Sequence, residues 1–315
     1  ISDQVFFLLI AISLLLAFIS WKWVEKPFRN RNKISRKGIF TFSAAGMLIF
    51  VILGSILSLS NGLVYRYKEV EQEIYKEFME LGSYVPINMG LSKLKDFEKD
   101  DTRKKLLVIG DSYAEDLVNA IKESDLDSQY QLSTYRIPAN CGVLFIERDT
   151  IEEFQPPTCR QRPNFFNEPK LERLLVEADE IWLESNWQDW QVKFLTKSLM
   201  RLRDINSNLV LFGSKKFQIT SASEYKNNYG LAGIKKEFDI SNKQKSLTIQ
   251  LDTIAKEINI KFVDPMYVIC GSNKVCKHSF DNKGIISVDG RHLTPYGAKH
   301  FGYKLSQYIK SEEFL

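Results

Sequence analysis

The alternation of short apolar segments with amphipathic segments between residues 105 and 310 most constrains the fold of this chain. Short apolar runs are typical of buried strands, whereas apolar residues at helical spacing indicate helices packed on a core. Strands that alternate with helices form a parallel sheet covered on both faces. The sequence therefore predicts a three-layer α/β/α fold. The expected strands are 106–109, 131–137, 180–184, 208–212 and 261–264, and the expected helices are 112–123, 170–178, 191–206, 239–259 and 295–310.

The first expected strand ends abruptly at Gly110-Asp111-Ser112. Functional residues of open parallel sheets gather at the carboxyl ends of the strands. A strand-to-helix turn there lifts a hydroxyl out of the core and places it near helix N-terminal amides, so we predict that Ser112 is a nucleophile. Asp111 is predicted to anchor the turn. Because ordinary turns also use glycine, aspartate and serine freely, this motif needs partners elsewhere in the chain.

A serine nucleophile needs a general base, and the three histidines of the chain are the candidates: His278, His292 and His300. Only His292 follows a carboxylate, Asp289, by three residues. In a turn or helix this spacing places both side chains on one side, where the carboxylate can hold the imidazole tautomer that accepts a proton. We therefore predict a triad of Ser112, His292 and Asp289. The other two histidines are predicted to have packing or surface roles.

Two uncharged stretches near the N-terminus, residues 5–21 and 38–65, approach or exceed the length of a bilayer span. We interpret both as transmembrane helices. A signal peptide is the alternative for the first stretch, but it lacks a basic start and a small-residue cleavage site.

The segment between these stretches carries seven basic residues and one acidic residue. The positive-inside rule makes this loop cytoplasmic and places the chain after residue 65 on the opposite side of the membrane. The first 60 residues contain seven basic and two acidic residues, which leaves 36 and 37 in the remainder. The remainder is thus close to neutral, and this balance excludes a basic nucleic-acid-binding surface.

All four cysteines, Cys141, Cys159, Cys270 and Cys276, lie in the part predicted to be extracytoplasmic, where disulfides persist. Three pairings are possible. We favour Cys141 with Cys159 and Cys270 with Cys276, because each pair closes a short loop rich in turn residues. A zinc site is the weaker alternative, because the chain has no Cys-x-x-Cys pair.

The order of Gly110-Asp111-Ser112, Asn186 and Asp289-x-x-His292 on an α/β pattern resembles the SGNH hydrolase (GDSL-like) family, which is named for its Ser, Gly, Asn and His. The resemblance covers about residues 104–309. It implies an SGNH-hydrolase-like three-layer α/β/α fold with a parallel central sheet, preceded here by two transmembrane helices.

The resemblance also implies roles for individual residues. Ser112 is the expected nucleophile, His292 the base and Asp289 the residue that orients the base. The expected oxyanion hole combines the Ser112 amide, a glycine amide and the Asn186 side chain, with Gly142 after the second strand as the glycine. The alternative is that Asn186 only ends a strand and takes no part in an oxyanion hole.

Three tryptophans lie close to Asn186 in sequence. Trp182 falls inside an apolar strand and is predicted to be a core residue. Trp187 and Trp190 flank Asn186 and are predicted to line an acceptor cleft, where their rings would contact a sugar.

The motif Trp23-Val24-Glu25-Lys26-Pro27-Phe28-Arg29 after a hydrophobic helix resembles the end of the acyltransferase-3 (AT3) membrane domain. In bacterial members this domain is often followed by one more transmembrane helix and a periplasmic SGNH domain, and such fusions are similar to surface-polysaccharide O-acetyltransferases. The implied domains are 1–37, the last helix and cytoplasmic tail of the membrane domain; 38–63, an additional transmembrane helix; 64–103, a periplasmic linker; and 104–315, the catalytic domain. Within the linker, apolar residues at helical spacing predict an amphipathic helix over 64–81, followed by a connector over 82–101. Most of the membrane domain is missing, so the chain resembles the C-terminal part of a longer protein or a truncated one.

These resemblances imply an O-acetyltransferase that transfers acetyl from Ser112 to a sugar hydroxyl of a surface polysaccharide such as lipopolysaccharide O-antigen, or of its lipid-linked precursor. A membrane-anchored acetyl esterase with the same triad is the alternative, and a glycan-binding module with a decayed site is a third possibility. We expect no cofactor or metal in this segment, with the acetyl donor, acetyl-CoA, used by the missing membrane domain. The expected partners are the polysaccharide, the lipid bilayer and an AT3 domain. The expected location is the bacterial inner membrane, with the C-terminal domain in the periplasm.

Overall fold

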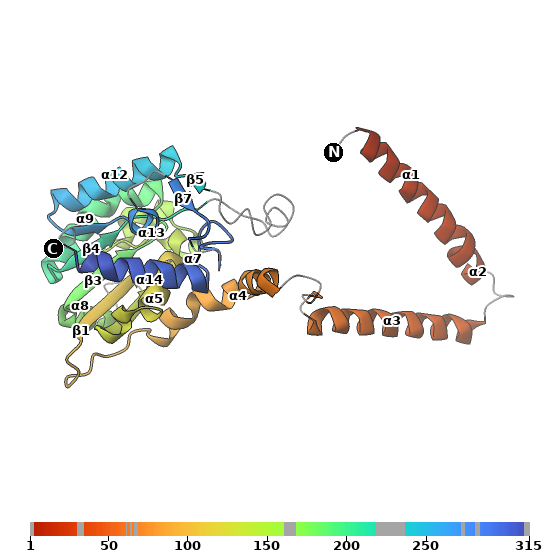
Figure 1. Cartoon of the computed structure of the whole chain (residues 1–315), viewed down its shortest axis with the longest axis horizontal. Helices are drawn as coiled ribbons and strands as arrows, with labels where there is room; N and C mark the ends of the chain where they lie inside the picture. The colour runs from red at the N-terminus through yellow and green to blue at the C-terminus, as the bar shows by residue number, and fades with distance from the viewer. Residues whose placement is uncertain are drawn as a thin grey trace. The chain divides into compact units, whose positions relative to one another are not determined.

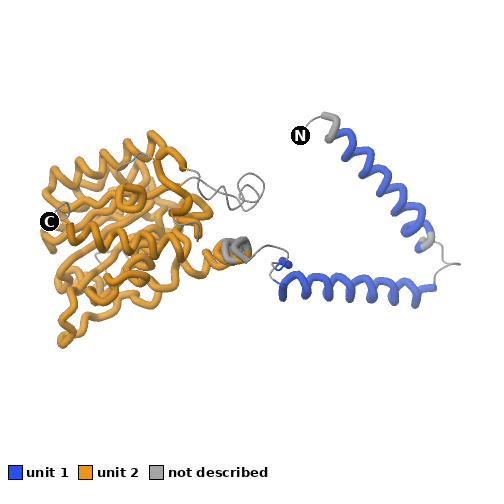
Figure 2. The backbone as a smooth tube through the Cα atoms, viewed as in Figure 1, with its two compact units in different colours: residues 1–67 blue, residues 68–315 orange. Residues whose placement is uncertain are grey.

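The structure of the 315-residue chain is a computed structural model (Figure 1). It describes residues 3–29, 35–60, 62–63, 65, 69–160, 168–217, 237–271, 275–280 and 284–311. The chain divides into two compact units, residues 1–67 and 68–315, which are described separately (Figure 2).

The first unit consists of apolar helices. Its elements are α1 (Asp3–Ser20), a π-helical turn η1 (Trp21–Glu25), α2 (Lys26–Arg29) and α3 (Arg36–Leu59). The segments Phe6–Glu25 and Arg36–Leu59 have mean hydropathies of 2.1 and 2.3, and no residue of either window is buried. By length and composition both are able to cross a membrane, and their apolar side chains are then covered by lipid.

The second unit begins with α4 (Glu69–Leu91), which packs against the globular part of the same unit. The sequence pattern indicated a helix that ends near Leu81, followed by a connector. The structure continues the helix to Leu91, because Leu81, Val85 and Met89 recur every four residues and form a buried face. The Asn119 side chain of α5 (Ser112–Lys122) donates hydrogen bonds to the carbonyls of Tyr84 and Val85.

A parallel five-stranded sheet forms the centre of this unit. Its strands are β1 (Lys104–Gly110), β2 (Tyr130–Arg136), β3 (Glu180–Glu184), β4 (Leu209–Phe212) and β6 (Lys261–Val263), in the order β2-β1-β3-β4-β6. The strand order reverses between β1 and β3, and in open parallel sheets such a reversal opens a crevice at the carboxyl ends of the strands. The predicted nucleophile follows β1 directly.

Helices cover both faces of the sheet (Figure 1). One layer contains α5, α13 (Pro265–Cys270) and α14 (Pro295–Ile309), and the other contains α8 (Pro169–Glu177), α9 (Asp189–Ile205) and α12 (Asn242–Glu257). Successive side chains of β1 enter different cores: Leu106 and Val108 pack in the first layer, and Leu107 and Ile109 pack in the second. The predicted three-layer α/β/α fold is confirmed.

Some short elements were not predicted from the sequence. They are the helices or turns η3 (Asp125–Ser128), η4 (Ala139–Cys141), α6 (Arg148–Ile151), η5 (Glu152–Phe154) and α7 (Pro157–Arg160), and an antiparallel pair of β5 (Glu237–Asp239) and β7 (Val275–Lys277). The expected helix from residue 239 starts instead at Asn242, because Ser241 caps its N-terminus by accepting a hydrogen bond from the Gln244 amide.

Both predicted disulfides are present. Cys141 is bonded to Cys159 with a Cα–Cα distance of 5.5 Å, and Cys270 is bonded to Cys276 with a Cα–Cα distance of 4.9 Å. The first bridge joins residues 18 positions apart, whereas the second joins residues six positions apart.

We expect the double replacement Cys141→Ser/Cys159→Ser to destabilise the protein more than Cys270→Ser/Cys276→Ser. A bridge that closes a longer loop removes more conformational entropy from the unfolded chain, and the loop lengths here correspond to a difference of about 1 kcal/mol. Urea unfolding of both variants beside the wild type measures this difference. An equal loss, or a larger loss for the second pair, would contradict the expectation.

Candidate active site

Ser112 is the first residue of α5 and is partly exposed at the end of β1. Asp111 caps the helix, because its Oδ1 accepts a hydrogen bond of 2.8 Å from the Tyr113 amide. Gly110 permits a close approach of two strands, since a Cβ at this position would lie 1.8 Å from the carbonyl oxygen of Glu184 in β3. The local sequence thus places the serine hydroxyl at a helix N-terminus outside the sheet.

Asp111 also joins this turn to the loop after β3. Its Oδ2 accepts hydrogen bonds from the Ser185 hydroxyl at 2.7 Å and from the backbone amide of Asn186 at 2.9 Å. Burial raises the pKa of Asp111, and these hydrogen bonds act in the opposite direction. The Asn186 side chain is half-buried and forms no hydrogen bond with any residue that the structure describes. The structural role predicted for Asp111 agrees with these contacts, while the oxyanion role of Asn186 stays a prediction.

His292 lies in the loop before α14. Oδ1 of Asp289 accepts hydrogen bonds from the backbone amides of Arg291 at 2.8 Å and His292 at 2.7 Å. Thr294 then caps α14 by accepting a hydrogen bond from the Gly297 amide at 3.0 Å. Asp289 therefore holds the turn that carries His292.

The imidazole of His292 rests on the first turn of α5. Its Nδ1 lies 3.4 Å from Oδ2 of Asp116, and its ring makes an edge contact with Tyr113 at a centroid distance of 6.1 Å. The structure thus brings His292 to the helix that begins at Ser112. No hydrogen bond joins the Ser112 hydroxyl to His292 here, and such contacts are often long before a substrate binds.

Asp116 was not a candidate from the sequence. Asp289 was predicted to orient the imidazole, whereas in the structure its hydrogen bonds to His292 go to the backbone and Nδ1 faces Asp116. The orienting role of Asp289 stays a prediction. Asp116 and His292 are 176 residues apart in the chain, and no local motif relates them. The one available signal was an acidic residue four positions after Ser112, on the same helix face.

Two carboxylates set the protonation of His292. Burial lowers the pKa of the imidazole, but the hydrogen bond and charge of Asp116, together with the charge of Asp289, outweigh burial and hold the pKa above its ordinary value. These negative charges stabilise the imidazolium that forms when the base accepts a proton.

A buried ionic cluster lies behind Asp116. The side chains of Lys215, Asp116 and Glu184 are all 0% exposed. Nζ of Lys215 lies 3.0 Å from Oε1 of Glu184, 3.2 Å from Oδ2 of Asp116 and 3.1 Å from the Tyr113 carbonyl oxygen. Burial raises the pKa of Glu184 to about 8. Burial lowers the pKa of Lys215, but the two carboxylates outweigh it and keep the ammonium charged.

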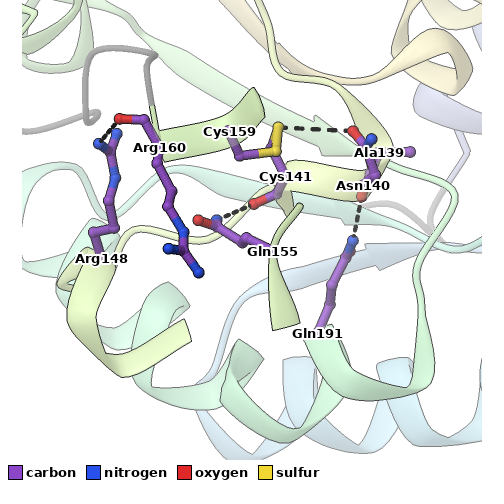
Figure 3. The surroundings of a disulfide bond; sticks show 8 residues. All are labelled: Ala139, Asn140, Cys141, Arg148, Gln155, Cys159, Arg160 and Gln191. Carbon is purple, nitrogen blue, oxygen red and sulfur yellow. Dashed lines mark hydrogen bonds between the residues drawn. A yellow bond between two sulfur atoms is a disulfide. The ribbon is translucent and has the colours of Figure 1, made fainter. Parts of the chain in front are cut away.

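Gly142 has a left-handed backbone (φ 78°), and a Cβ there would lie 2.5 Å from the Trp190 ring. The preceding residues Ala139–Cys141 are held from three sides, as Figure 3 shows: by the disulfide to Cys159, by Gln155 at the Cys141 carbonyl, and by Gln191 at the Ala139 carbonyl. The Gly142 amide lies 3.3 Å from the Ala139 carbonyl oxygen. Its position is therefore well supported, and its oxyanion role stays a prediction.

The three tryptophans occupy different environments. Trp182 is fully buried, as predicted. Trp187 is only 3% exposed and its indole N–H donates to the Phe212 carbonyl, so its ring belongs to the core and does not fit the predicted acceptor cleft. Trp190 is partly exposed, covers Gly142 and stacks on Phe154 at a centroid distance of 5.7 Å. Among the two predicted cleft residues, Trp190 alone keeps surface for a ligand.

A serine after the first strand and a histidine before the last helix of a parallel α/β/α sandwich define a serine-hydrolase-like protein of the SGNH class. Residues 86–307 match the model of the SGNH domain that is fused to AT3 domains, and the chain belongs to this family. The match begins inside α4, which agrees with the packing of that helix on α5.

The fold of this chain is also found in a solved structure. The periplasmic domain of a lipopolysaccharide acetyltransferase from Salmonella ser. Paratyphi A has a TM-score of 0.53 and 13% identity, and the match covers 79% of this chain and 99% of that one. A carbohydrate acetylesterase from Sinorhizobium meliloti has a TM-score of 0.38 and 12% identity, with 66% of this chain and 99% of that chain covered. A search of curated proteins found no match.

Proposed function

We propose that this chain belongs to an O-acetyltransferase that carries an acetyl group on Ser112 and transfers it to a sugar hydroxyl of a cell-surface polysaccharide, such as lipopolysaccharide O-antigen. The observation that carries this proposal is the position of His292 on the first turn of the helix that begins at Ser112. This arrangement supports a nucleophile and a base that act together at the carboxyl end of β1, where the strand order reverses.

In the proposed reaction the Ser112 hydroxyl attacks the acetyl carbonyl while Nε2 of His292 accepts the serine proton. The resulting oxyanion is stabilised by the Ser112 and Gly142 amides and the Asn186 side chain. When the tetrahedral intermediate collapses, the imidazolium protonates the leaving group. His292 then removes a proton from the sugar hydroxyl as the sugar oxygen attacks the acetyl-enzyme. When this second intermediate collapses, the bond between Oγ of Ser112 and the acetyl group breaks, and the imidazolium returns the proton to Oγ.

The family match and the similar Salmonella domain support transfer to a glycan over hydrolysis. The family model describes SGNH domains fused to AT3 domains, and the similar Salmonella domain is named as part of a lipopolysaccharide acetyltransferase. Two apolar helices precede the domain and two disulfides lie within it, which suit a membrane-anchored protein with an extracytoplasmic domain. Tethering to an acyl-delivering membrane domain raises the local donor concentration, which a free esterase does not need. We place the protein in the bacterial inner membrane, with the domain in the periplasm and acetyl-CoA as the donor used by the membrane domain.

The test is the acetyl content of the surface glycan in cells that express the full-length protein with Ser112→Ala. We expect acetylation to fall to the level of cells without the gene, because the acetyl group can no longer be carried to the acceptor. Ser128→Ala, at an exposed serine, is the control and should leave acetylation unchanged. Increased acetylation in Ser112→Ala would mean that the domain removes acetyl groups, and the esterase alternative would replace our proposal.

A further inference from the structure

Asp116 lies one helical turn after Ser112 and is completely buried. Its Oδ2 faces two basic groups. It lies 3.4 Å from Nδ1 of His292 and 3.2 Å from Nζ of Lys215. Its Oδ1 has no hydrogen-bond partner among the described residues. Desolvation disfavours the charge of a buried carboxylate, so such a group needs a compensating partner.

Lys215 is the compensating partner of Asp116. Its ammonium is buried, contacts Asp116 and Glu184, donates to the Tyr113 carbonyl and lies 4.2 Å from the centre of the Tyr113 ring. The cluster holds one cation and two carboxyl groups, and burial raises the pKa of Glu184 to about 8. At neutral pH Glu184 therefore retains a proton. The Lys215 ammonium lies 3.2 Å from the same Asp116 oxygen that faces His292.

Asp289 has a different set of partners. Its Oδ1 accepts hydrogen bonds from two backbone amides and lies 3.4 Å from the Ser287 hydroxyl. These contacts hold the turn before α14. Nδ1 of the His292 imidazole faces Asp116 and not Asp289. The charged groups that act on His292 are thus Asp116 from α5, Asp289 from its own turn and Lys215 from the loop after β4.

We infer that Asp116, held in place by Lys215, is the positioning residue that orients the His292 imidazole and stabilises its protonated form, while Asp289 holds the backbone of the turn. The inference rests on the proposed function of Ser112 and His292. In each proton transfer Nε2 gains or loses the proton, while the Nδ1 proton remains hydrogen-bonded to Asp116. No proton passes to Asp116, whose role is to fix the tautomer and supply the opposite charge.

The pKa of His292 itself tests the inference. In the full chain in detergent micelles, ¹³C labelling of the imidazole carbons gives signals from only three histidines, and His292→Gln identifies the relevant one. Asp116→Asn should lower the pKa of His292 by about 1 or more, because it removes the negative charge that faces Nδ1. Asp289→Asn is the matched control, since asparagine still accepts from the backbone amides, and it should shift the pKa by less than half as much.

A larger shift in Asp289→Asn than in Asp116→Asn, or an equal one, would overturn the inference. If Asp116→Asn does not fold, Asp289→Asn still decides: a pKa close to wild type supports our assignment, and a fall of about 1 refutes it. This measurement does not depend on turnover, so absence of acetyl transfer would refute the proposed function without affecting the result for Asp116.

Kinetics provide a second readout that a purely structural role would not change. Asp116→Asn should lower kcat on an acetyl ester by roughly 10²-fold with little change in KM, because the base is misoriented in the transition state. The acidic limb of the kcat/KM profile should move to lower pH, since a base with a lower pKa stays neutral at lower pH. A profile with an unchanged limb would contradict the inference.

Discussion

Replacement of Ser112 by alanine should reduce acetyl-ester turnover by at least about 10³-fold, and His292→Ala should have a similar effect. Ser112 forms the covalent bond and His292 accepts its proton in the same step. Loss of either residue therefore removes the contribution of both to the rate. The double variant should therefore be no slower than either single variant. Residual turnover would come from binding and from oxyanion stabilisation by the remaining groups.

Initial rates with an activated acetyl ester, measured on the full chain in detergent, test this expectation. Ser112 is partly exposed, so its replacement leaves no buried cavity, and circular dichroism should confirm an unchanged fold. Ser128→Ala is the control for the loss of a serine hydroxyl and should keep the wild-type rate. Wild-type turnover in Ser112→Ala would show that another residue is the nucleophile.

Replacement of Lys215 by methionine should have the largest effect on stability. Methionine has a similar length but no charge, so Asp116 and Glu184 would remain buried without their cation. Loss of one partner from a buried ion pair typically costs about 3–5 kcal/mol. The free energy of unfolding in urea measures the loss at pH 7.

Lys256→Met provides a matched control. Lys256 pairs with Asp252 on the surface of α12, and its side chain is 75% exposed. Exposed pairs of this kind contribute about 0–1 kcal/mol, so this variant should stay close to wild type. Similar unfolding free energies for the two variants would show that the buried cluster does not stabilise the fold as its geometry indicates.

The loss in Lys215→Met should also depend on pH. Burial raises the pKa of Glu184 to about 8, above its ordinary value of 4.5, so the folded state binds this proton more tightly than the unfolded state. Such a group favours the folded state at low pH, and its contribution is lost as the pH rises from about 4.5 towards 8. Lys215 lowers the pKa of Glu184, so in Lys215→Met this pKa should rise further and the loss of stability should continue above pH 8. The destabilisation should therefore be smaller at pH 5 than at pH 8.

Local sequence signals predicted most of the fold. The apolar run before Gly110 indicated β1, and Asp111 and Thr294 each cap the expected helix that follows them. Both disulfides were predicted because each connects nearby positions. Signals of this kind depend on a few neighbouring residues, and the structure changes only the ends of such elements. The extension of α4 to Leu91 and the short pair of β5 and β7 were not predicted, because both depend on packing against distant segments.

The sequence alone determined which residues have the chemistry for acyl transfer: a serine at the end of a buried strand, three histidines, and one histidine with a nearby carboxylate. Only the tertiary structure decided which carboxylate faces the imidazole and which cation neutralises it. Asp116 and His292 are 176 residues apart, and Lys215 and Glu184 are 31 residues apart on different elements. Such contacts depend on how α5, β3 and the loops after β4 and before α14 pack together. Tertiary packing likewise assigned Trp187 to the core, because burial depends on the residues that surround a side chain in space.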